Sequence, residues 1–312
     1  MIKRLTIISI VFILGCISLK AQGVELSNYY LYDKYVINPA SAGDLSYQPI
    51  VISLRKQWAG ISDSPLSQTI FSHKKFSNNV NVGIKLFNDS YGVLNKTGGE
   101  LTYAYNLSIN PKNNTFVSFG LSAIVFQKGI NYSKLMVERS EDPLINESNK
   151  SIISPDFGLG VVYHTRTFEG GISLPRSFLF KSDINGEGLM DFREDREFLF
   201  HGSMKFDYDK KSVLIPTGLV RVQSNGLTQL DLSLLYQYNN MIHAALTYRT
   251  TDSFSITGGV DTKYITVFYS FNMGLNQLSS NSLGSHELML AYKFDSGNSK
   301  SSGSRKSFGR RR

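Results

Sequence analysis

Ser285, His286 and Glu287 are consecutive and carry the three side-chain types of a nucleophile–base–acid relay. Such a relay works only if the three groups converge on one reacting atom. From 286 to 294, large apolar residues recur at every second position, as they do in a β-strand. Successive side chains of a strand point to opposite faces, so Ser285 and Glu287 share one face and His286 lies on the other. This geometry opposes catalysis, and we expect no enzymatic activity.

Metal chemistry has no better support. None of the histidines pairs with another at the spacing of metal ligands. They are His73, His164, His201, His243 and His286. The acidic stretch 181–197 does not match the ligand spacing of a known calcium loop, so a solvated surface loop is the better interpretation. We therefore predict no metal and no other cofactor.

The first 22 residues predict the compartment. A basic start precedes an apolar run over 5–14, and small residues ending at Ala21 offer a cleavage site. This pattern is typical of a secretory signal peptide over residues 1–22, and the apolar run is too short to span a bilayer as a helix. Cys16, the only cysteine, lies inside it. An alternative is a lipoprotein-processing box at 13–16, which would leave Cys16 lipidated.

The net charge of +8 belongs to the two ends of the chain. Residues 1–22 carry +3 and residues 295–312 carry +5, so residues 23–294 are neutral. A neutral body gives no basic surface for a nucleic acid, and we predict no nucleic-acid partner.

The rest of the chain repeats a period of two, which is typical of β-strands. The predicted strands lie near 49–57, 67–74, 80–88, 97–109, 115–131, 156–165, 167–174, 197–208, 212–223, 228–238, 241–249, 253–261, 264–272 and 285–294. Several have the 9–11 residues that a tilted strand needs to cross an outer membrane, and aromatic residues often mark their ends. Short links such as Asn239-Asn240 contrast with long polar links at 132–155 and 175–196.

This pattern predicts an all-β fold, a transmembrane antiparallel β-barrel of about 14 strands, in the cell outer membrane. Residues 49–294 form the barrel, and residues 23–48 form a short N-terminal segment at the periplasmic mouth or in the lumen. Residues 295–312 form a flexible basic C-terminal tail. A secreted β-sandwich or a propeller is the alternative, but so many alternating strands would expose much apolar surface in water.

Polar residues on the non-lipid face of the strands are the better functional candidates. They are Asp231, Gln237, His243, Arg249, Glu287 and Lys293. A barrel of about 14 strands has a lumen too wide for side chains alone to fill, so water, the N-terminal segment or a partner's polypeptide must occupy it. A satisfied polar network inside the barrel is the other interpretation of these residues.

Short blocks of sequence, in one fixed order, resemble the PorP/SprF family of type IX secretion proteins. The blocks are Asn38-Pro39-Ala40-Ser41-Ala42-Gly43, Arg55-Lys56-Gln57-Trp58-Ala59-Gly60, Asn88-Asp89-Ser90-Tyr91-Gly92 after the third strand, Tyr103-Ala104-Tyr105, Ser154-Pro155-Asp156-Phe157-Gly158, and Gly284-Ser285-His286-Glu287-Leu288-Met289-Leu290. The resemblance implies a non-enzymatic barrel in contact with outer-membrane lipid. It would serve type IX secretion, gliding motility or the surface attachment of a secreted partner, so a secreted adhesin or secretion-machinery proteins are the implied partners. The alternative is a passive channel or a fatty-acid-transporter-like barrel for small solutes.

Two segments need a role within this picture. Pro39 and Gly43 fix bends in the segment before the first strand, so we expect it to close the barrel, with Trp58 at a membrane interface. Direct partner binding is the alternative. The 18 residues after Phe294 exceed what the family shows, and they concentrate candidate docking residues for the periplasmic part of the secretion machinery. These are Arg305, Lys306, Arg310, Arg311 and Arg312.

Overall fold

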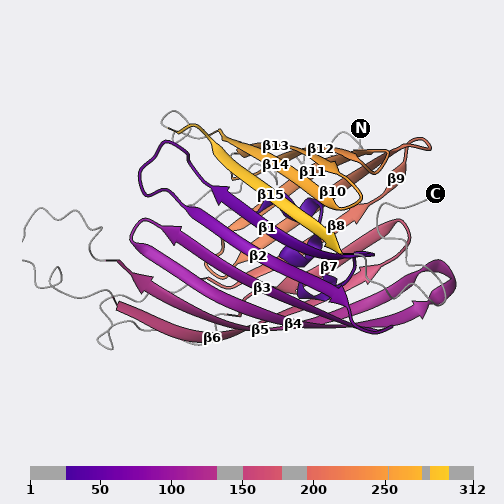
Figure 1. Cartoon of the computed structure of the whole chain (residues 1–312), viewed down its shortest axis with the longest axis horizontal. Coiled ribbons are helices and arrows are strands. Elements are labelled where there is room, and N and C mark those ends of the chain that lie inside the picture. The colour runs from indigo at the N-terminus through magenta and orange to yellow at the C-terminus, as the bar shows by residue number, and fades with distance from the viewer. Residues whose placement is uncertain (1–25, 132–149, 178–194, 252, 276–281, 295–312) are drawn as a thin grey trace, which may run out of the picture.

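The computed structural model describes residues 26–131, 150–177, 195–251, 253–275 and 282–294. Within them, the chain forms one antiparallel sheet that closes on itself as a barrel (Figure 1). The wall strands, in chain order, are β1 (Gln48–Lys56), β2 (Leu66–Lys75), β3 (Val80–Tyr91), β4 (Leu94–Asn110), β5 (Thr115–Ile130), β6 (Lys150–His164), β7 (Phe168–Leu174), β8 (Glu197–Met204), β9 (Phe206–Asp207), β10 (Ser212–Gln223), β11 (Thr228–Tyr238), β12 (Ile242–Arg249), β13 (Ser253–Asp261), β14 (Ile265–Gly274) and β15 (Ser285–Phe294). Pairing of β15 with β1 closes the barrel.

The short strand β9 continues β8 rather than adding a new strand to the wall. Both pair with β10 in one register, in which Thr217 faces Ser203 and Leu214 faces Phe206. Between these pairs β10 carries Pro216, which has no N–H to donate to a ladder. Counted as one strand, β8 and β9 make the barrel 14-stranded, which confirms the sequence prediction.

Side chains alternate between the outside and the inside of the wall. Leu246, Val267 and Leu290 point outward with 50 %, 38 % and 47 % of their surface exposed. Thr247 and Ser270, their neighbours on β12 and β14, point inward and are buried. The outer face is therefore apolar, as a strand in contact with lipid requires.

The two ends of the barrel differ in the length of their connections. Six connections of three or four residues lie at the end that carries Gln48 and Phe294, where β1 begins and β15 ends. These are 76–79, 111–114, which holds the short helix η4 (Pro111–Asn113), 165–167, 208–211, 239–241 and 262–264. The longest connections lie at the opposite end, and they are 57–65, 131–149, 175–196 and 275–284. Outer-membrane barrels keep short turns in the periplasm, so we name these the periplasmic end and the surface end.

Residues 26–47 lie inside the barrel, and we call this segment the plug. It contains three short 3₁₀ helices, η1 (Asn28–Leu31), η2 (Lys34–Val36) and η3 (Pro39–Ser41), which appear as indigo coils within the wall (Figure 1). The side chain that precedes each helix, from Ser27, Asp33 or Asn38, accepts a hydrogen bond from the helix's second N–H. None of the helices in the described residues is long and apolar enough to cross a membrane.

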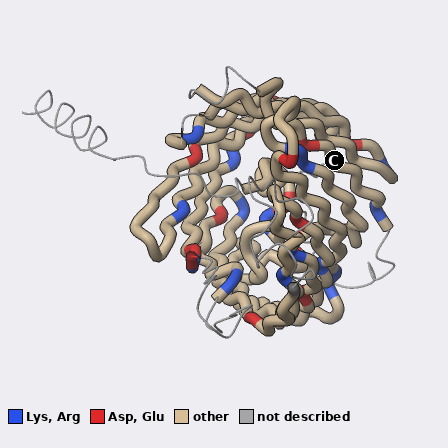
Figure 2. The backbone as a smooth tube through the Cα atoms, turned by 90° about the vertical axis from the view of Figure 1, so that its left-hand side faces the viewer, with Lys and Arg blue, Asp and Glu red and all other residues tan. Residues whose placement is uncertain are grey.

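Charged residues of both signs are spread around the barrel, as Figure 2 shows in a view from the surface end. This distribution agrees with the neutral charge balance of the sequence between the two terminal segments.

Candidate functional site

The Asn-Pro-Ala-Ser-Ala-Gly block lies in the lumen, where it docks the plug onto the wall. The Asn38 side chain is fully buried and caps η3, because its Oδ1 accepts a hydrogen bond of 2.9 Å from the Ala40 N–H. Its Nδ2 lies 3.3 Å from the carbonyl oxygens of both Val161 and Ile172, and 3.2 Å from Nε2 of His201. One amide side chain therefore joins η3 to β6, β7 and β8.

Two glycines on the inner face of the wall make room for this block. A Cβ added to Gly120 would lie 2.2 Å from the backbone nitrogen of Ala40. A Cβ added to Gly160 would lie 2.0 Å from Oδ1 of Asn38. Only a residue without a side chain permits this approach of another backbone, so β5 and β6 carry glycine here because the plug packs on them.

A buried carboxylate–histidine pair fixes the middle of the plug to β2. Asp33 Oδ2 lies 2.8 Å from Nε2 of His73, and the Gly43 N–H donates a 2.9 Å hydrogen bond to Nδ1 of the same ring. Because Nδ1 accepts, Nε2 carries the hydrogen and donates it to Asp33. Gly43 adopts this position with φ of 75°, in the left-handed region that favours glycine.

Two tyrosines of the plug reach opposite sides of the wall. The Tyr35 hydroxyl lies 2.9 Å from Oγ1 of Thr102 on β4, and the Tyr30 hydroxyl lies 3.2 Å from Oγ of Ser233 on β11. Burial raises the pKa of both tyrosines, so both hydroxyls stay neutral. The plug is thus bound across the whole width of the lumen.

The first described residues of the plug lie near the surface end, where charged side chains hold them. Arg55 on β1 donates to the carbonyl oxygen of Leu26, and Nη2 of Arg249 lies 3.5 Å from the same oxygen. Glu287 on β15 accepts from the Ser27 hydroxyl and, at 3.0 Å, from the Asn28 N–H. We call these contacts of residues 26–28 the latch.

The Asn28 side chain uses its donors and its acceptor within the latch. Its Nδ2 donates to Oγ of Ser270 at 2.8 Å and to Oδ1 of Asn272 at 2.6 Å. Its Oδ1 accepts from Nη2 of Arg249 at 3.1 Å. Arg249 in turn forms a buried ion pair with Asp231, so a single polar network joins the start of the plug to β11, β12, β14 and β15.

The structure places the six predicted lumen residues on the inner face of the wall, in two groups. Arg249 and Glu287 belong to the latch at the surface end, and Asp231 pairs with Arg249 there. The other three lie toward the periplasmic end, where Gln237 and His243 are buried and paired in register. Lys293 there forms an ion pair with Asp261.

The block from Arg55 to Gly60, at the surface end, combines a latch residue with a turn. Arg55 is a latch residue, while Gln57 is buried and its N–H donates to the Pro65 carbonyl. Trp58 has a φ of 45°, and its N–H donates to Oγ of Ser285. Gly60, with φ of 90°, lies in the same connection. This block therefore joins the start of one connection to the first residue of the last strand.

The sequence prediction that the block from Asn88 to Gly92 follows the third strand is wrong. Asn88 and Asp89 lie within β3, which continues to Tyr91 because β4 pairs with it as far as Leu94. Asn88 points outward and accepts a hydrogen bond of 2.6 Å from the Thr97 hydroxyl. Gly92 forms the turn with φ of 60°.

The remaining block residues lie on opposite faces of the wall. Asp156 points inward from β6 and accepts a 3.1 Å hydrogen bond from the Ser177 N–H. His286 points outward, and its Nδ1 lies 2.6 Å from the Tyr269 hydroxyl, on the face opposite to Glu287. The candidate docking residues Arg305, Lys306, Arg310, Arg311 and Arg312 fall outside the described residues, as does Cys16.

Five residues of the site were not predicted from the sequence. One is the plug residue Asn28, and the others are wall partners of the plug, namely Gly120, Gly160, His73 and His201. One signal was available, because a glycine on the polar face of a long alternating strand marks a close approach of other backbone. The histidines gave no such signal, since their partners lie far away in the sequence.

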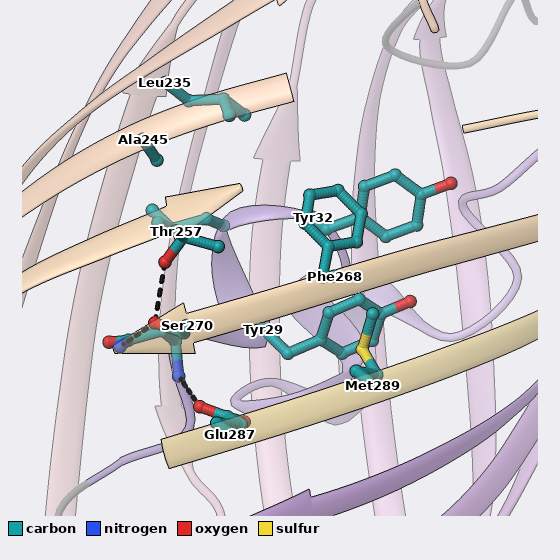
Figure 3. A pocket seen from close by; sticks show the side chains of 11 residues that line it. Tyr29, Tyr32, Leu235, Ala245, Thr257, Phe268, Ser270, Glu287 and Met289 are labelled. Carbon is teal, nitrogen blue, oxygen red and sulfur yellow. Dashed lines mark hydrogen bonds between the residues drawn. The ribbon is translucent and has the colours of Figure 1, made fainter. Parts of the chain in front are cut away.

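A narrow apolar cavity separates η1 from strands β11 to β15 (Figure 3). Its empty space is about 380 Å³, including the part that opens to solvent. Tyr29, Tyr32, Phe268 and Met289 form its apolar side, and Figure 3 shows Ser270 with its hydrogen-bonded neighbours at the polar edge. In the described part of the chain, no three His, Cys, Asp or Glu residues come together as a metal site.

The fold is similar to that of several solved barrels, at low sequence identity. The toluene transporter TbuX of Ralstonia pickettii has a TM-score of 0.51 and 12 % identity, covering 82 % of this chain and 92 % of that chain. A FadL homologue of Pseudomonas aeruginosa has a TM-score of 0.47 and 11 % identity, covering 83 % and 92 %. The outer membrane protein Omp33 of Acinetobacter baumannii has a TM-score of 0.49 and 7 % identity, covering 80 % and 98 %. A search of curated protein sequences finds no significant match.

A family profile described as type IX secretion system membrane protein PorP/SprF matches residues 19–292. The match spans the plug and almost the entire wall, and it includes every block on which the sequence resemblance rested. The chain is therefore an outer-membrane β-barrel and belongs to the PorP/SprF family of type IX secretion system membrane proteins.

Proposed function

We propose that this barrel is a non-enzymatic carrier of a secreted protein in type IX secretion, gliding or surface attachment. The observation that supports the proposal most is the occupied lumen. Asp33, Tyr35 and Asn38 bind the plug to β2, β4 and β6 to β8, and the latch binds it to β1, β12 and β15. A lumen that is filled by a plug bound to several strands favours a carrier over an open pore for free diffusion.

The charged residues of the lumen support a binding role rather than catalysis. Glu287 accepts a hydrogen bond from the Asn28 N–H, and Arg249 donates one to the Asn28 side chain. His286 lies on the opposite face of the wall from Glu287, so the only adjacent Ser-His-Glu triplet is split between lipid and lumen. The apolar outer face of the wall supports contact with outer-membrane lipid.

The partner can be a secreted adhesin or a component of the secretion machinery. Membership of a family described as type IX secretion system membrane proteins supports both. Tagged protein, crosslinked in its own cells and purified, should bring down one abundant secreted or machinery protein that a tagged unrelated barrel does not. Recovery of no specific protein under these conditions would contradict the proposal.

A passive channel for small solutes is the second candidate function, and one observation favours it. The cavity between η1 and β11 to β15 is lined mostly by apolar side chains, as a path for an apolar solute would be. Planar-bilayer recordings of the purified protein separate the two functions. A steady open conductance without any partner supports the channel, and a closed barrel supports the carrier.

A further inference from the structure

We propose that the wall residues of the latch, Arg55, Arg249 and Glu287, bind a short polypeptide segment of the secreted partner, and that residues 26–28 occupy this site until the partner arrives. This inference rests on the proposed function, because it takes the partner to be a protein. It goes further by naming the site, the main-chain groups that the site binds and one side chain that the site selects.

The latch recognises main chain before it recognises side chains. Arg55 and Arg249 meet the carbonyl oxygen of Leu26, and Glu287 meets the N–H of Asn28. A carbonyl and an N–H two residues apart are present in nearly every polypeptide. The same three charged groups can therefore hold a segment of another protein in the same way.

One position of the latch is selective. The buried carboxamide of Asn28 donates two hydrogen bonds, to Ser270 and Asn272, and accepts one from Arg249. A side chain that lacks these groups leaves buried polar atoms without partners, which costs more than the bonds themselves. The site therefore favours a segment with asparagine at this position.

The position of the latch in the barrel fits a partner outside the cell. Arg249 is the last residue of β12 and Arg55 is the last but one of β1, both at the surface end. Leu26 and Ser27 are half-buried, while Asn28 is fully buried. A polypeptide that approaches from the surface meets the half-buried residues Leu26 and Ser27 first. It can then replace residues 26–28 one after another.

Full-length protein in detergent and a labelled peptide with the sequence of residues 24–31, VELSNYYL, test this inference. Peptide binding is measured by fluorescence anisotropy, and heat-dependent mobility on gels confirms that each variant is folded. The variant Ser27→Ala/Asn28→Ala keeps the wall of the site but weakens its internal occupant. We expect it to bind the peptide at least tenfold more tightly than the wild-type protein.

A second peptide, in which alanine replaces the asparagine, should bind the same variant at least tenfold more weakly. Equal binding of the peptide to variant and wild type, or equal binding of both peptides, would overturn the inference. If the double variant does not fold, Ser27→Ala alone should still bind the peptide about threefold more tightly than wild type, and no increase would count against the latch.

The outcomes separate this inference from the proposed function. A specific secreted protein recovered from cells without peptide binding in solution refutes the latch alone. Asparagine-dependent peptide binding without any secreted or machinery protein in cells refutes the proposed carrier role and leaves the latch as a polypeptide site.

Discussion

Asp231 and Arg249 face each other across β11 and β12 and form an ion pair in which both side chains are fully buried. Oδ2 of Asp231 lies 2.8 Å from Nη2 of Arg249, and both carboxylate oxygens lie 3.0 Å from Nε. The same guanidinium reaches Asn28, so the pair connects the wall to the start of the plug.

Removing one member of the pair should destabilise the barrel strongly. Arg249→Ala leaves the Asp231 carboxylate buried without its cation, which costs about 3–5 kcal/mol. The double variant Asp231→Leu/Arg249→Met removes both charges and should lie closer to wild type. Denaturant unfolding of refolded protein in detergent measures the difference, and equal stability of the two variants would show that the pair is not buried as described.

Adding a methyl group to Gly120 should expel the plug and leave the wall intact. The Cβ of Gly120→Ala would clash with the backbone of Ala40, and overpacking of this kind costs about 1–3 kcal/mol. Gly218→Ala, on the outer face of β10, is the control for an added methyl group, because no neighbouring atom lies within 4 Å of its added Cβ.

Two measurements follow the plug in these variants. A cysteine at the buried position Ser41 should react with a maleimide in the Gly120→Ala protein and stay protected in the control, since the only native cysteine, Cys16, lies in the predicted signal peptide. Planar bilayers should show new conductance for Gly120→Ala alone. Equal protection and equal conductance in both variants would argue against glycine-dependent docking.

The lipid face should tolerate charge only near the ends of strands. Leu246→Arg places a charge on an outward position in the middle of β12, which costs about 2–4 kcal/mol near the bilayer midplane. Thr228→Arg, at the surface end of β11, should cost about 0–1 kcal/mol because the site lies near the interface. Unfolding from lipid vesicles compares the free energies of unfolding of the two variants. Similar losses would show that the membrane does not cover the wall as described.

Deleting residues 297–312 should leave insertion unchanged and weaken an association in the periplasm. Both Gln48 and Phe294 lie at the periplasmic end, so the basic tail begins on that side. We expect the truncated protein to stay heat-resistant on gels and to recover less of the periplasmic machinery. Salt should weaken the recovery by the full-length protein, because screening acts on exposed charges. A truncated protein that recovers the same partners at every salt concentration would exclude the docking role of Arg310, Arg311 and Arg312.

The sequence by itself determined the wall. A strand repeats every two residues, and this period is local, so the alternation at Leu246 and Thr247 reveals which side chain faces lipid without knowledge of the neighbouring strands. Turn residues such as Asn239 and Asn240, both at positive φ in the structure, mark hairpins in the same local way. For this reason the 14 strands, and the inward position of Arg249 and Glu287, were predictable.

Only the tertiary structure decided what fills the lumen. Asn38 meets His201, and Asn28 meets Ser270, because closure of the barrel brings strands that are distant in sequence around one short segment. The residues that share a level inside the barrel depend on the register of every strand between them, and a local pattern carries no record of that register. The contacts that hold the plug in the lumen, the two glycines that make room for it and the latch therefore became visible only once the sheet was closed.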